Sequence, residues 1–213
     1  MKRIFVAIAL LTTLFTTNAQ AKLELATIED IVNNEKYYFN DIVEIYKSDD
    51  PYLRMDDIAL VYYSQAFKAA DKDSEENNKL LKQYYNENEF KKLYAVATRV
   101  LEQKPANLNA LFYAWVAAKE IGKSNEEILS YVNKFNRIVQ MITEYGDGKS
   151  CESPFCIVHP DDQTFIISTL EVESISDKFD IETLCNIHTI KPTKRFRSGV
   201  LYFDLSLFLK QKK

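Results

Sequence analysis

The sequence contains few of the residues on which most recognisable sites depend. Its 213 residues include only four glycines, three cysteines, two histidines and one tryptophan. Hydrophobic residues nevertheless make up 46% of the chain, which is enough apolar material for a buried core, so disorder is not expected. The length suits one domain or two small ones.

Long apolar runs are also scarce, and the one of note lies at the start of the chain. Lys2 and Arg3 precede an apolar run from Ile4, and residues 19–21 (Ala-Gln-Ala) form a small-x-small cleavage pattern. The run is interrupted well before the roughly 20 residues that a membrane-spanning helix needs. Residues 1–21 therefore read as a secretory signal peptide, with no membrane span after its cleavage. We expect an exported protein in a bacterial periplasm, with secretion or the cell surface as alternatives.

An excess of positive charge is absent as well. The predicted signal peptide holds two of the 27 basic residues and none of the 31 acidic ones, so the remainder has a net charge of −6. Nucleic-acid-binding domains usually carry a basic surface. We therefore expect no nucleic-acid partner.

Apolar residues recur at helical spacing in residues 22–146, which we expect to form a helical region. Thr27, Asn107 and Ser124 are candidate N-caps, the last with Glu127 in a capping box, and Gly122 is a candidate C-cap. Short links between successive helices imply antiparallel hairpins. The expected helices cover about residues 27–46, 56–69, 74–85, 89–104, 107–122 and 124–145.

Part of this region repeats itself. A shift of 34 residues places Leu80 on Ala114 and Tyr84 on Ala118, at packing positions of a helix hairpin. In period and in the closing Pro105 this part resembles the tetratricopeptide repeat family. About two repeats are visible, fewer than such arrays usually need, so another part of the chain should cover the end of the stack.

From residue 147 onward the apolar period changes to two. Four short segments rich in β-branched and aromatic residues predict a small antiparallel sheet of three or four strands, packed on the helices. They span residues 154–159, 164–172, 183–190 and 199–208. The expected fold class is therefore α+β, with helical hairpins in residues 22–146 and a β region in residues 147–213.

All the cysteines and histidines lie between Cys151 and His188, in "YGDGKSCESPFCIVH" and "CNIH". Although "GDGKS" looks like the end of a phosphate loop, Thr143 stands where that loop needs a glycine. We interpret Gly146 and Gly148 as a helix stop and turn with positive φ. No nucleotide or other cofactor is expected.

Cysteine and histidine are good zinc ligands, but alternation along a strand would send Cys156 and His159, and likewise Cys185 and His188, to opposite faces. We therefore expect no metal. A disulfide between Cys156 and Cys185, or between Cys151 and Cys156, is an alternative to cysteines that act as small buried hydrophobes.

A hydrolytic site has little support in the sequence. His159 is a candidate base, and the nearby Asp161 and Asp162 are candidate groups to orient it. No G-x-S-x-G elbow, however, identifies a nucleophile. A small hydrolase or metal-binding protein that uses the cluster at 151–188 stays the alternative function.

Four segments resemble one exported bacterial family of about this length, known only as a domain of unknown function. They are "YYSQAF" at 62–67, "VLEQKPANLNALFYAWVAAKEIG" at 100–122, "YGDGKSCESPF" at 145–155 and "LYFDLS" at 201–206. The resemblance supports the fold and implies no catalytic or cofactor residues.

The preferred hypothesis is an exported, non-catalytic module that binds a protein or peptide. In tetratricopeptide repeats the first helix of each hairpin lines the concave face, and amides, amines and aromatic rings there suit an extended chain. Mapped onto this sequence, the candidate groove row consists of Asn78, Lys82, Tyr85, Asn109, Phe112, Val116 and Lys119. The alternative for its aromatic members is that they are core, buried by the β region.

Overall fold

A computed structural model describes residues 24–67 and 74–211. The predicted signal peptide and the end of the helix predicted over residues 56–69 lie outside the described residues. The helices of the first part are α1 Leu25–Asn34, α2 Lys36–Lys47, α3 Met55–Tyr63, the 3-10 turn η1 Ser64–Ala66, α4 Ser74–Asn86, α5 Phe90–Gln103, α6 Leu108–Glu120 and α7 Asn125–Tyr145.

Local sequence signals set several of these boundaries. Asn107 caps α6 by accepting a hydrogen bond from the Ala110 amide at 2.8 Å, and Ser124 caps α7 through the Glu127 amide at 3.2 Å. Gly122 ends α6 with a φ of +73°, as its predicted C-cap role requires.

The first predicted helix is two helices, and its predicted cap is wrong. α1 begins at Leu25 after Glu24, two residues before Thr27. The chain then leaves helical geometry at Glu35 (φ −113°, ψ 50°) before α2 begins. The apolar spacing continues across this break, because both helices bury residues against the same core.

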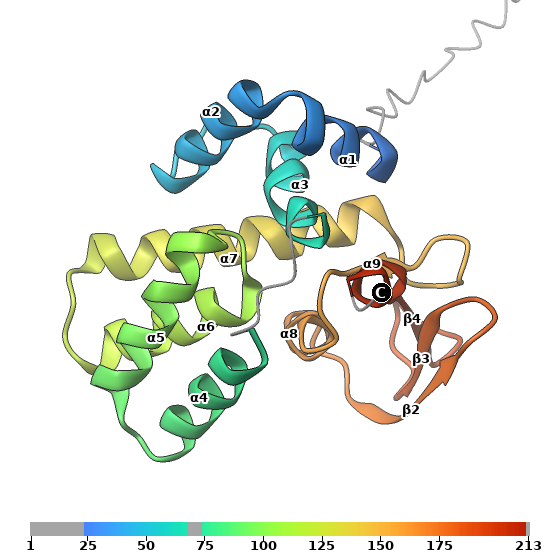
Figure 1. Ribbon diagram of the computed structural model, residues 1–213. Coiled ribbons are helices and arrows are strands. Elements are labelled where there is room, and N and C mark those ends of the chain that lie inside the picture. The colour runs from blue at the N-terminus through green and yellow to red at the C-terminus, as the bar shows by residue number, and fades with distance from the viewer. Residues whose placement is uncertain (1–23, 68–73, 212–213) are drawn as a thin grey trace, which may run out of the picture.

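The long helix α7 runs across the molecule and carries the other elements (Figure 1). α4, α5 and α6 pack in chain order at one end, with α6 against α7. α3 packs on α7 from the opposite side and carries α1 and α2, while β1 lies near the other end of α7. α7 thus links the helical stack, which consists of α4, α5 and α6, to the sheet.

The C-terminal part is mixed rather than purely β. Its elements are β1 Phe155–Cys156, α8 Asp162–Thr169, β2 Ser174–Asp180, β3 Cys185–Ile190, β4 Val200–Asp204 and α9 Ser206–Lys210. The strands form one sheet in the order β1-β4-β3-β2, in which β1 is parallel to β4 and the other pairs are antiparallel. The prediction of a purely antiparallel sheet is therefore wrong, because the short β1 joins with parallel orientation.

Two segments were assigned incorrectly. Residues 164–172, predicted as a strand, contribute most of α8, because a short apolar run such as Phe165–Ile167 does not distinguish a strand from a helix by periodicity. β2 was missed because nearly all its residues are exposed, so its sequence has no half-buried alternation. The strands predicted around β3 and β4 are confirmed.

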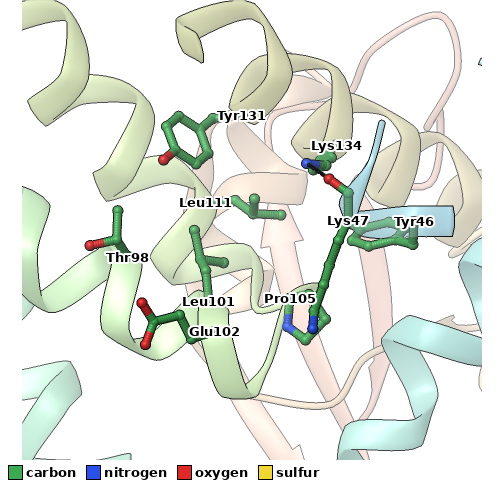
Figure 2. A pocket seen from close by; sticks show the side chains of 9 residues that line it. All are labelled: Tyr46, Lys47, Thr98, Leu101, Glu102, Pro105, Leu111, Tyr131 and Lys134. Atoms are coloured by element: carbon green, nitrogen blue, oxygen red, sulfur yellow. Dashed lines mark hydrogen bonds between the residues drawn. The ribbon is translucent and has the colours of Figure 1, made fainter. Parts of the chain in front are cut away.

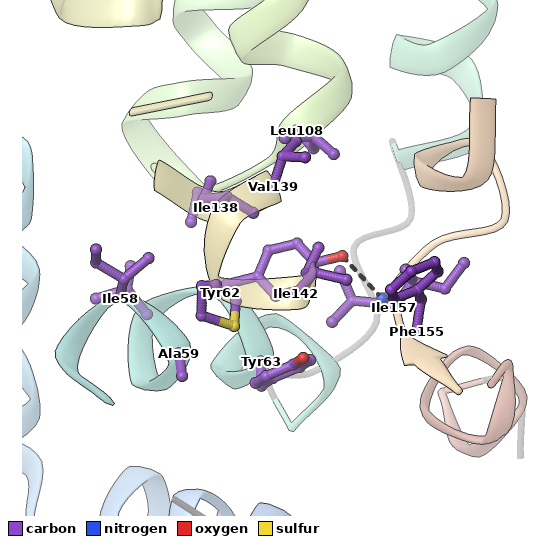
Figure 3. Close-up of a cluster of buried hydrophobic side chains, with 14 of the residues drawn as sticks. Ile58, Ala59, Tyr62, Tyr63, Leu108, Ile138, Val139, Ile142, Phe155 and Ile157 are labelled. Atoms are coloured by element: carbon purple, nitrogen blue, oxygen red, sulfur yellow. Dashed lines mark hydrogen bonds between the residues drawn. The ribbon is translucent and has the colours of Figure 1, made fainter. Parts of the chain in front are cut away.

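The main core lies where α3, α7 and the start of the C-terminal part meet. Figure 3 shows Tyr62 and Tyr63 of α3 among Ile138 and Ile142 of α7, with Ile157 beyond them. A smaller cluster, centred on buried side chains such as Leu81, Leu93 and Ala114, holds α4, α5 and α6 together. The helical stack thus has apolar contacts of its own in addition to those with the main core.

Two glycines shape the turn between α7 and β1, for different reasons. Gly148 has a φ of +65°, as predicted, and a Cβ there would also run into the ring of Phe155. Gly146 has an extended φ of −138°, so its predicted positive φ is wrong. A Cβ at Gly146 would overlap the carbonyl of Pro154, and close backbone approach is the reason for glycine there.

Candidate functional site

The candidate groove row lies on two neighbouring helices. Asn78, Lys82 and Tyr85 stand on α4, and Asn109, Phe112, Val116 and Lys119 on α6. Three of the seven, Asn78, Lys82 and Phe112, contact the start of the C-terminal part of this same chain.

Two polar members of the row, Asn78 and Lys82, contact the turn before α8. Asn109 Nδ2 donates to Asn78 Oδ1 at 3.0 Å, and Asn78 Nδ2 lies 3.4 Å from His159 Nε2. Lys82 Nζ lies 3.0 Å from a carboxylate oxygen of Asp161. Amides and an amine therefore meet a chain segment here, and that segment is residues 159–161.

The aromatic centre of the row packs on α8. The Phe112 ring lies with its centroid 5.0 Å from that of Phe165 and 6.3 Å from that of Phe135, and the side chain is half-buried. Tyr85 stays 40% exposed and Lys119 is exposed. The start of α8 thus covers much of the face on which a partner chain was expected.

A different concave surface lies between α2, α5, α6 and α7 (Figure 2). We call it the cleft. Its volume is about 400 Å³, within the range of small-ligand and side-chain pockets. Its walls are largely leucine, proline and tyrosine carbon, and the lining residues are Tyr46, Lys47, Thr98, Leu101, Glu102, Pro105, Leu111, Tyr131 and Lys134.

Lys134 places a cation in this mostly apolar cleft. Its Nζ donates to the carbonyl oxygen of Lys47 at 2.9 Å and to Ser130 Oγ at 3.0 Å. Burial lowers the pKa of the Lys134 amine, and Asp49 opposes the shift. An ammonium has three N–H donors and two are used here, so one can still be offered to a bound acceptor.

Tyr46 adds a buried polar atom beside the same cleft. Its side chain is 2% exposed, and its hydroxyl has no hydrogen-bond partner within the described part of the chain. Burial raises the pKa of Tyr46 well above its ordinary value, so the phenol is neutral. A buried hydroxyl without a partner is uncommon in folded proteins.

A second depression adjoins the cleft, because Tyr131 and Lys134 line both. It has a volume of about 350 Å³ and extends along the first turns of α7 past Ser130 to Glu126 and Glu127. The cleft and this second depression together offer an apolar pocket, a central cation and an acidic end.

Sequence reasoning missed this surface. Lys134 precedes the buried Phe135 on α7 and reads as an ordinary charged neighbour of an apolar stripe. Only the approach of the end of α2 to α7 places the Lys47 carbonyl beside its amine. No signal in the sequence predicts that approach.

The cysteines form a disulfide, but with neither of the predicted pairings. Cys151 is bonded to Cys185, with their Cα atoms 6.2 Å apart. Cys156 and Cys185 both stand opposite Asp204, on either side of β4. Cys156 and Cys185 are therefore two strand spacings apart, about 10 Å in total, which is beyond the reach of a disulfide. The interpretation of Cys185 as only a small buried hydrophobe is therefore wrong.

The two histidines lie in separate hydrogen-bond networks. His159 follows β1, so the prediction that it is a strand residue is wrong. Its Nδ1 accepts a hydrogen bond from the Asp161 amide at 3.1 Å. His188 lies in β3 and contacts α8 on the face opposite the disulfide. Within residues 24–67 and 74–211, no three His, Cys, Asp or Glu side chains form a group that could hold a metal ion.

Asp162 is the most strongly perturbed carboxyl near these networks. It is 2% exposed and accepts from Tyr62 Oη at 2.7 Å and from the His159 amide at 3.2 Å. Burial raises the pKa of Asp162 to about 7, although the hydrogen bonds from Tyr62 and His159 oppose the shift. Because the group is enclosed, it ties α8 to α3 and is not open to a substrate.

Comparison with known proteins adds a family but no activity. A family model described as Domain of unknown function (DUF4919) matches residues 26–213, and the chain belongs to this family. No curated protein and no solved structure matches the chain. The resemblance to tetratricopeptide repeats therefore stays a prediction. Among the described helices, none has both the length and the apolar character needed to cross a membrane.

Proposed function

We propose that this member of the DUF4919 family is a module that binds an extended peptide or protein segment through the cleft and the second depression. The observation that carries the proposal is that two adjoining depressions share Lys134 and Tyr131. A compact ligand needs one pocket, whereas an extended chain places successive groups in neighbouring ones.

The lining predicts the chemistry of the segment. One apolar side chain would enter the cleft against Leu101 and Leu111, where its burial provides most of the affinity. A carbonyl or carboxylate oxygen would accept from Lys134, and a basic side chain would lie toward Glu126. These three features define a short motif.

The candidate groove row has less support as the binding surface. Asn78, Lys82 and Phe112 already contact His159, Asp161 and Phe165 of this chain. A partner would have to displace α8, whose Ile166 is completely buried. We therefore place the binding surface on the other side of the stack.

A phage-displayed library of linear heptapeptides tests the proposal. We expect selection on the wild-type protein to enrich peptides with an apolar and a basic residue. Thr98→Trp, which fills the cleft from a half-buried position, and Lys134→Met should each weaken a selected peptide at least about tenfold, the effect of losing roughly 1.4 kcal/mol of binding free energy.

The control is Lys91→Met, which removes an exposed lysine of α5 that lines neither depression. It should leave binding unchanged. Selected peptides that bind Thr98→Trp and Lys134→Met as tightly as wild type would refute the cleft. Loss of binding in the double variant Lys82→Glu with Lys119→Glu instead would return the site to the candidate groove row.

We also propose that the protein is exported, with cleavage close to Lys22. Lys2, Arg3 and the Ala-Gln-Ala pattern at 19–21 support this, and the family match begins only at residue 26. Intact mass of the protein recovered from the periplasm tests it. A mass that still includes residues 1–21 would contradict cleavage.

A further inference from the structure

A serine and a histidine are hydrogen-bonded at the outer edge of the sheet. Ser174 begins β2 and His188 lies in β3, and Ser174 Oγ is 2.9 Å from His188 Nδ1. The register of β2 shifts between Ser174 and Ser176, a β-bulge of the kind that redirects side chains near functional sites. Ser174 is exposed, whereas His188 is 9% exposed.

Gln163 of α8 determines which imidazole nitrogen carries the proton. Its Nε2 donates to the Pro160 carbonyl at 3.0 Å, which orients its Oε1 toward His188 Nε2, 2.7 Å away. Asn186 Nδ2 also lies 3.2 Å from Nε2, but its two hydrogens go to Gln163 Oε1 at 2.7 Å and to Asp177 Oδ2 at 3.1 Å. Since a carbonyl oxygen can only accept, His188 Nε2 carries the hydrogen. In a neutral imidazole Nδ1 is then the acceptor, and Ser174 must donate to it.

The surroundings keep this imidazole in its basic form. Burial lowers the pKa of His188 from 6.5, so the ring is neutral at pH 7. Asp177, its partner across the β2–β3 ladder, opposes that shift and would stabilise an imidazolium once a proton arrives. Asn186 holds Asp177 by donating from Nδ2 to Oδ2 at 3.1 Å.

We propose that Ser174 is a nucleophile and His188 its general base, in a site that takes small, unhindered esters. A hydroxyl within hydrogen-bond reach of a base, with that base oriented by a third group, is the arrangement that activates serine. Gln163 is the positioning residue. The site lies on β2 and β3, apart from the cleft on α2, α5, α6 and α7, so either can fail without the other.

The reaction is an acyl transfer. Ser174 Oγ attacks the ester carbonyl carbon as its proton passes to His188 Nδ1, and the new bond forms as the ester C–O bond breaks. The leaving alkoxide takes that proton from His188 and departs as the alcohol. Water then adds to the acyl-serine, with its proton again taken by His188, and the carboxylic acid leaves while Ser174 regains its hydrogen.

Exposure limits the substrate class. Six of the seven residues of β2 are exposed, so the serine stands at an open edge rather than in a deep pocket. Such an edge provides no enclosed surface to hold a long acyl chain, so we expect small esters whose carbonyl is accessible.

An alkyl fluorophosphonate provides the test, because an activated serine displaces its fluoride and keeps a stable phosphonyl group. We expect one adduct on the wild-type protein, located at Ser174 by peptide mapping. Ser174→Ala should give no adduct, and His188→Gln should slow labelling by about 100-fold or more. The matched control Ser176→Ala, an exposed serine two residues along β2, should label like wild type.

The pH profile separates a catalytic from a structural network. Labelling of wild type should already be maximal at pH 7, because His188 is neutral there. Gln163→Glu places a carboxylate beside Nε2 and should move the midpoint of labelling to higher pH, with folding checked by the melting temperature. Absence of a Ser174 adduct, equal labelling of His188→Gln, or an unmoved midpoint would each show a structural network only.

Discussion

The Tyr62 hydroxyl donates a hydrogen bond to the Asp162 carboxyl over 2.7 Å and joins helices that stand 100 residues apart in the chain. The Val158 amide donates to the same hydroxyl at 3.2 Å. This chain of hydrogen bonds fixes the start of α8 on α3, and through α8 it places Phe165 against Phe112 and Gln163 against His188. Both the covered face of the stack and the histidine network therefore depend on it.

Asp162→Asn should change how stability depends on pH. The folded-state pKa of Asp162, about 7, lies above its ordinary value of 3.8, so the neutral form favours folding. Its contribution is complete below about pH 4 and is lost as pH rises through 7, a difference of roughly 4 kcal/mol. Urea unfolding from pH 4 to pH 8 should show wild type losing stability relative to Asp162→Asn. A constant difference between the two proteins would contradict the raised pKa.

Phe112→Ala should destabilise the protein by about 3 kcal/mol, because the ring packs between Phe165 and Phe135. The half-buried position puts the value at the low end for such a change. Tyr85→Ala, at a ring that is 40% exposed, should cost less and serves as the control. If Phe112→Ala unfolds with the same midpoint in urea as wild type, the ring faces an open groove.

Cleavage of the Cys151–Cys185 disulfide should lower stability by roughly 4 kcal/mol, from the entropy of a loop closed over 34 residues. Denaturant titrations with and without reductant measure the difference, and Cys151→Ala should reproduce the reduced protein. Unreduced, denatured protein should show one reactive thiol, that of Cys156. Peptide mapping that finds Cys156 in the bridge would contradict this pairing.

Gly146→Ala and Gly122→Ala should differ although both glycines follow a helix. A Cβ at Gly146 would overlap the Pro154 carbonyl, so we expect a loss of about 2 kcal/mol or more. An alanine at Gly122 would have open space around its Cβ, and only the φ of +73° would strain it, at a cost of about 1 kcal/mol. Thermal unfolding of the two variants measures the order, and the reverse order would contradict the close approach at Gly146.

The sequence alone was enough for the features that depend on neighbouring residues. Asn107 and Ser124 cap their helices through amides three residues away, and Gly122 ends α6 by its own backbone conformation. The helical spacing up to Tyr145 and the alternation of β4 likewise follow from one element burying one face. Such signals are local, and so they were readable without knowledge of the fold.

Only the tertiary structure decided which distant residues meet. Because β4 lies between β1 and β3, Cys156 is kept away from Cys185, which pairs with Cys151. The Lys134 amine meets the Lys47 carbonyl only because α2 ends against α7. Ser174 and His188 meet at a bulge on a strand whose exposure hides it from periodicity. In each case the contact is set by how separate elements pack, and apolar patterns specify burial but not the partner.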